Sequence, residues 1–88
     1  TLWSIAVSNT NAAARFLKLY NLTTAPTVGT SVPVFTVAIP SGGTVLVNGG
    51  SNGIRFATGI SLAITGAAGD LDTTAIGAGD VKVATTYT

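Results

Sequence analysis

The sequence predicts an all-β fold, a small antiparallel β-sandwich or barrel of about six or seven short strands. Several short segments alternate apolar and other residues with a period of two, and Gly, Pro and Asn separate them. No segment shows a sustained helical period. The 88 residues suffice for one core, so we expect a single β-sandwich domain over residues 1–88. Because the chain starts at Thr1 and enters an apolar strand at once, we expect a trimmed N-terminus.

The first two strands are expected over residues 2–8 and 15–22. The turn residues between them, 9–11, favour a hairpin, because Asn tolerates left-handed backbone and bonds its own main chain. Alternation within these strands assigns the inward positions to Trp3, Ile5, Val7, Leu17 and Leu19.

The rest of the chain is expected to form four or five further strands. A polar loop, residues 23–31, has a length that fits a crossing from one sheet to the other, and we expect it to contact a partner. A Gly-rich loop over residues 66–79 is long enough to be functional or disordered. The expected core consists of Trp3, Leu17, Leu19, Phe35, Val37, Ile39, Ile60, Leu62 and Ile64.

The composition indicates a chain that packs against neighbours. Charged residues make up 8% of the chain, against about 25% in ordinary soluble domains, and the net charge is +1. So few charges leave copies poorly repelled, and a net charge near zero favours association. There is no Cys for a disulfide, so oligomerisation or docking is the expected source of added stability. The four basic residues are scattered, and no apolar run is long enough for a membrane span, so we expect neither nucleic acid nor membrane as a partner.

Catalytic chemistry has little support in these residue types. The chain lacks His, Cys and Glu, so neither a Ser-His nor a Cys-His pair can form. We therefore expect no enzymatic activity and no cofactor. Asp70 and Asp72 are weak candidates for a Ca²⁺ site, and the favoured interpretation is that they are solvated loop charges.

A partner-contact surface is the remaining candidate site. Phe16, Lys18 and Tyr20 share the strand face opposite Leu17 and Leu19. Two aromatic rings around one charge suit an interface, but a second face covered by the chain itself explains the pattern equally well. Arg55 lies between two apolar residues and is expected to bond carbonyls of the neighbouring loop, with contact to a partner as the alternative. The candidate contact residues are Phe16, Lys18, Tyr20, Pro26, Val28 and Arg55.

Several motifs between Asn9 and Ile64 resemble those of a known protein family. They read Arg-Phe-Leu-Lys-Leu-Tyr-Asn, Ala-Pro-Thr-Val-Gly-Thr, Ile-Pro-Ser-Gly-Gly and Gly-Ile-Arg-Phe-Ala-Thr-Gly-Ile. This run resembles small β-sandwich virion structural proteins of tailed bacteriophages and prophages, which look like head decoration (cement) proteins.

The resemblance implies a non-enzymatic capsid decoration protein that stabilises the head in many copies on the capsid surface of the virion. Its implied partners are the major capsid protein and neighbouring copies of itself, as a homo-oligomer. The alternative is a host-recognition module on a tail, a fibre or the head surface.

Overall fold

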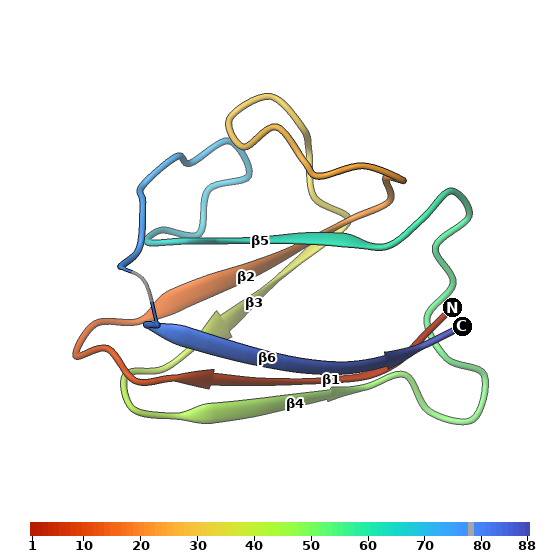
Figure 1. Ribbon diagram of the computed structural model, residues 1–88, viewed down its shortest axis with the longest axis horizontal. Helices are drawn as coiled ribbons and strands as arrows, with labels where there is room; N and C mark the ends of the chain where they lie inside the picture. Colours follow the sequence, from red (N-terminus) through yellow and green to blue (C-terminus); the bar gives the residue numbers. More distant parts are fainter. Residues whose placement is uncertain (78) are drawn as a thin grey trace.

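The protein is an all-β sandwich of two three-stranded antiparallel sheets, as the sequence predicts (Figure 1). A computed structural model describes residues 1–77 and 79–88. The expected loop over residues 66–79 therefore includes one position, 78, that lies outside the described residues. The strands are β1 (Leu2–Asn9), β2 (Arg15–Tyr20), β3 (Phe35–Ile39), β4 (Thr44–Asn48), β5 (Ser61–Thr65) and β6 (Val81–Tyr87).

The strand order corrects two of the expected connections. The sheets have the orders β4-β1-β6 and β3-β2-β5, so β1 and β2 are the central strands of different sheets and do not form a hairpin. The loop between β2 and β3 joins two neighbours in one sheet and does not cross between sheets.

Asn9 connects the end of β1 to the opposite sheet. Its buried amide donates hydrogen bonds to the carbonyls of Ile39 and Pro40, at 3.2 and 3.3 Å. The end of β1 is thereby fixed against the end of β3, in the opposite sheet.

The core lies between the two sheets, where most of the expected residues are found. Five predicted inward residues are fully buried: Ile5, Val7, Leu17, Leu19 and Ile39. Four more are partly buried against them: Phe35, Val37, Ile60 and Ile64. Leu2 and Phe56 complete the core and were not predicted. Each fully buried aliphatic or aromatic side chain contributes about 1.5–3 kcal/mol relative to an exposed one.

Trp3 is not a core residue, which corrects its predicted inward position. The β1–β6 register shifts between Leu2 and Ser4, so Trp3 has no partner across the ladder. An irregularity of this kind inverts the alternation, because one extra residue moves the following side chains to the other face. Leu2 therefore takes the inward position, and the Trp3 indole N–H donates to the Thr88 hydroxyl at 3.2 Å.

Leu62 also differs from its predicted full burial. It lies directly across from Leu19 and so faces the core side of its sheet. Its strand, β5, is the last in the order β3-β2-β5, however, and the side chain is 36% exposed. A residue on an edge strand has a neighbouring strand on one side only, which alternation within the strand cannot reveal.

Candidate functional site

Lys18 and Tyr20 lie on a face of β2 that the chain itself covers. Both residues are fully buried, and the Lys18 ammonium donates a hydrogen bond to the carbonyl of Gly69. Gly69 belongs to residues 66–77, the segment after β5, which we call the strap. The strap thus removes Lys18 and Tyr20 from the surface, which corrects their assignment as contact residues. The sequence is compatible with a partner-contact face or with a second face of β2 that the chain itself covers. The structure shows the covered face.

The layer beneath the strap contains two hydroxyl groups with no hydrogen-bond partner among the described residues. They belong to Tyr20 and Ser61, which are paired across β2 and β5. Burial raises the pKa of Tyr20, and the nearby Asp70 carboxylate raises it further. Such groups lose their hydration on folding without gaining a hydrogen bond in return. Their burial beneath the strap therefore lowers the free energy of unfolding.

The strap is itself held by one of the two predicted metal candidates. The Asp72 carboxylate accepts hydrogen bonds from the Thr74 hydroxyl at 2.9 Å and from the Thr74 N–H at 3.0 Å. The Thr74 hydroxyl bond lowers the pKa of Asp72, with a contribution from the charge of Lys18. Asp72 therefore acts as a turn-stabilising carboxylate. Within residues 1–77 and 79–88, no group of three or more potential metal-ligating side chains is found.

The remaining contact candidates are spread over separate parts of the molecule. Pro26 and Val28 are half-buried in residues 21–34, the loop between β2 and β3, and Phe16 is half-buried on β2. Arg55 is exposed, and its guanidinium makes no hydrogen bond to the described residues, so it does not bond loop carbonyls as expected. The six candidates do not form one continuous surface.

Two long loops lie together and form what we call the loop face, residues 21–34 and 66–77 (Figure 1). Gly29 has a φ of 94°, and a Cβ there would lie 2.8 Å from a Thr73 methyl carbon, so glycine permits the close contact. Three large apolar side chains are more than half exposed on these loops: Val32, Val34 and Leu71. Residues 23–31, which we expect to contact a partner, form part of this surface.

Two further apolar side chains, Leu46 on β4 and Tyr87 on β6, are about two-thirds exposed. Leu46 is not among the predicted contact residues. The signal was present, because Val45 and Val47 alternate inward and the residue between them must point outward.

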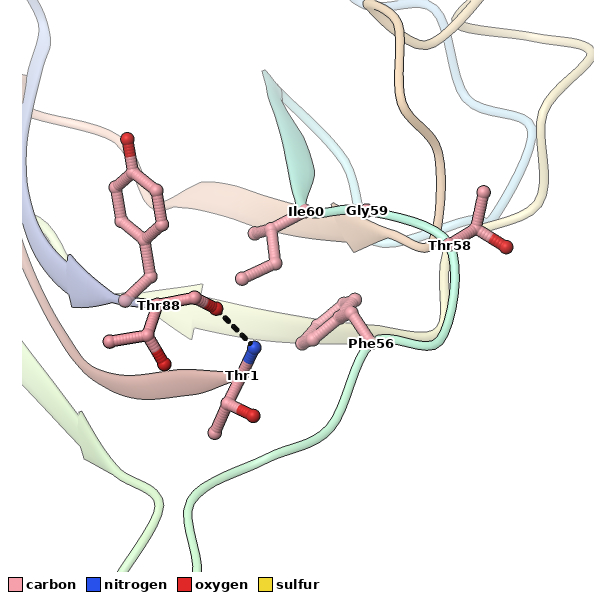
Figure 2. Close-up of a pocket in the computed structure, with 7 residues that line it drawn as sticks. Thr1, Phe56, Thr58, Gly59, Ile60 and Thr88 are labelled. Atoms are coloured by element: carbon pink, nitrogen blue, oxygen red, sulfur yellow. Dashed lines mark hydrogen bonds between the residues drawn. The ribbon is translucent and has the colours of Figure 1, made fainter.

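A hollow of about 300 Å³ opens near the two ends of the chain (Figure 2). The Thr1 ammonium donates to the Thr88 carbonyl oxygen at 2.7 Å beside it. The lining consists of Thr1, Phe56, Thr58, Gly59, Ile60, Tyr87 and Thr88. These residues combine apolar side chains with hydroxyl groups and include no acidic side chain, so the hollow can accept an apolar or hydroxylated group.

Comparisons with protein-family models, with curated proteins and with solved structures give no match. None of the described segments is a helix of the length and apolar character that a membrane crossing requires.

Proposed function

We propose that this chain is a non-enzymatic structural protein of a tailed-bacteriophage particle, and that it binds the capsid surface in many copies as a decoration protein. The motifs between Asn9 and Ile64 suggest the phage particle. The surface supports an assembly role, because five large apolar side chains are more than half exposed on a chain with seven charged residues. An isolated soluble domain usually keeps such side chains scattered among charges.

The loop face is the proposed capsid-binding surface, and its exposed apolar side chains are the observation that carries the proposal. Val32, Val34 and Leu71 belong to two loops that contact each other, so they can be buried by one partner surface. One of these loops is attached to β2, because the buried Lys18 ammonium donates to the Gly69 carbonyl. Many modest contacts of this kind become effectively permanent when neighbouring copies hold each one in place.

The copy number and position of the chain in purified particles test this function. Quantitative mass spectrometry with low-resolution imaging should find hundreds of copies over the capsid lattice. A double variant, Val32→Asp with Leu71→Asp, should fold normally and fail to bind capsids, because both side chains are exposed in the free chain. The matched control is Ala84→Asp, which puts a charge on the outer face of β6 and should leave capsid binding unchanged.

A host-recognition module remains the second candidate, and the hollow beside the exposed Tyr87 is the observation that favours it. An aromatic ring next to hydroxyl groups suits a sugar or a small apolar group. This function requires a few to a few dozen copies at a tail, a fibre or the head surface. The same copy-number measurement therefore separates the two proposals.

A further inference from the structure

The free edge of β4 has a backbone pattern that can be read from the hydrogen bonds at its two ends. The Asn9 N–H donates to the Gly43 carbonyl, and the Gly49 N–H donates to the Trp3 carbonyl, both at 2.9 Å. In an antiparallel ladder such bonded pairs alternate with non-bonded ones. Residues 43, 45, 47 and 49 therefore direct their backbone groups toward β1, and Thr44, Leu46 and Asn48 direct theirs away from it. β4 is the last strand in the order β4-β1-β6, so these outward groups face no further strand of the described chain.

This edge lacks the features that normally prevent edge-to-edge pairing. Natural edge strands carry charges or prolines or are covered by other segments. β4 has the sequence Thr-Val-Leu-Val-Asn, and its neighbour β1 is also uncharged. The other three edges are better protected. β6 carries Lys82, β3 is followed at once by Pro40, and the segment after β5 folds back so that the Gly66 N–H bonds the Thr74 carbonyl.

The sequence of β4 is complementary to itself in an antiparallel register centred on Leu46. In that register Leu46 lies opposite Leu46 of the partner subunit, Val45 opposite the partner's Val47, and Thr44 opposite the partner's Asn48. All three residues with outward backbone groups find bonded partners. The 65% exposed Leu46 side chain gains an apolar neighbour, and no like charges meet.

We propose that β4 pairs with β4 of a second copy of this chain, which joins two β4-β1-β6 sheets into one continuous six-stranded sheet with two-fold symmetry. The role of this dimer rests on the proposed function: a dimer would present two loop faces to a capsid. The outer faces of β1 and β4 carry small side chains beside Leu46, with the Ser8 and Thr44 hydroxyls bonded at 3.1 Å. The paired leucines therefore meet without obstruction from bulky neighbours.

Sedimentation equilibrium of the purified chain tests the pairing and its register. The contact is small, so the dimer is expected to be weak. The experiment should therefore extend to protein concentrations of about 1 mM, where a weak dimer is populated. The unmodified chain should dimerise. Leu46→Lys and Leu46→Glu should each weaken the dimer roughly 100-fold or more, because two like charges would face each other. An equimolar mixture of the two variants should dimerise again, with an affinity that falls as salt is raised.

Ala84→Lys is the matched control, since it adds the same charge to the same face at the opposite edge of the sheet and should not alter dimerisation. Circular dichroism should show that all variants keep the fold, because both positions are exposed. An unmodified chain that stays monomeric, a Leu46→Lys variant that still dimerises, or a mixture that does not associate would overturn the proposal.

The outcome is separable from that of the capsid experiment. A chain that dimerises through β4 but occurs in a few copies at the tail contradicts capsid decoration alone. A monomeric chain found over the whole capsid lattice contradicts only the β4 interface.

Discussion

The two sheets of this sandwich differ in how the chain treats their outer faces. The β3-β2-β5 sheet is packed on both sides, so that even Lys18 and Tyr20 are fully buried. The β4-β1-β6 sheet is covered on its inner side only, and its outer face consists mainly of small residues. Hydroxyl pairs such as Ser4 with Thr86, at 2.8 Å, link its strands there.

This difference separates the parts that stabilise the domain from those open to neighbours. Both long loops lie over β3-β2-β5, and they protect that sheet at the cost of burying polar groups. On the strands of the other sheet, the single charge is Lys82. A substitution of the same type should therefore affect stability on one sheet and association on the other.

The largest expected effect comes from Lys18→Glu. The substitution would put a buried carboxylate where the ammonium now donates to the Gly69 carbonyl, close to the carboxylates of the strap. An uncompensated buried charge destabilises a protein by about 3–5 kcal/mol, a large part of the stability of a domain this small. Urea unfolding of the purified variant measures the loss.

Lys82→Glu is the matched control on the open sheet. Lys82 is exposed on β6, so the same charge reversal should change the free energy of unfolding by no more than about 0.5 kcal/mol. Equal losses in the two variants would show that the sheets do not differ in the way described.

Asn9→Ala should produce the next largest loss, at the corner where the two sheets meet. The Asn9 amide donates to the Ala13, Ile39 and Pro40 carbonyls, and its side-chain oxygen accepts from the Asn11 N–H. Removing the side chain takes this donor away from the Ile39 carbonyl, whose bond to Asn9 is buried, and such a loss costs about 1–3 kcal/mol. Urea unfolding should show this loss. Asn48→Ala should cost about 0.5 kcal/mol or less, because the Asn48 side chain is exposed and makes one local bond, to the Gly50 N–H.

Local patterns made the strands and much of the core predictable from the sequence. Alternation placed Ile5 and Val7 in β1, and Leu17 and Leu19 in β2, because a strand with one buried face imposes a period of two on its residues. The irregularity at Trp3 broke this rule. Its position depends on how β1 pairs with β6, about eighty residues away in sequence, and not on the residues around it.

Pairing partners and loop positions could not be predicted in this way. The pattern of β2 shows two alternating sets of residues, but only the fold shows that the strap covers Lys18. Likewise, the Asn9 turn is compatible with a hairpin or with a crossing, and contacts to β3 decide between them. The candidate contact residues were therefore less predictable than the core.

Tyr20→Phe should have a smaller effect, and in the opposite direction. The Tyr20 hydroxyl is buried without a partner among the described residues, so its removal should raise the free energy of unfolding by up to about 1 kcal/mol. Burial raises the pKa of Tyr20, so the unfolded chain ionises first as the pH rises past about 10, and stability falls there. Urea unfolding from pH 8 to 11 should show a shallower alkaline decline in the variant. A loss of stability at pH 8 would mean that the hydroxyl is satisfied.

The smallest expected effect lies at low pH, where Asp80 links the two sheets. Its carboxylate accepts from the Gly77 N–H at 3.0 Å and pairs with Arg15 of β2 at 3.3 Å, just before β6 begins. The Gly77 bond lowers the pKa of Asp80 most, and the side chains of Asn11 and Arg15 lower it further, below its ordinary value near 4. The stabilisation is therefore complete above that value and is lost as the pH falls through the lowered pKa. In urea unfolding, Asp80→Asn should be less stable than the unmodified chain at pH 6, and the two stabilities should converge once the pH has fallen well below the ordinary carboxyl value near 4. Stability curves that stay parallel from pH 6 to pH 3 would contradict the role of the ionised carboxylate, and the link between the sheets would then depend on packing alone.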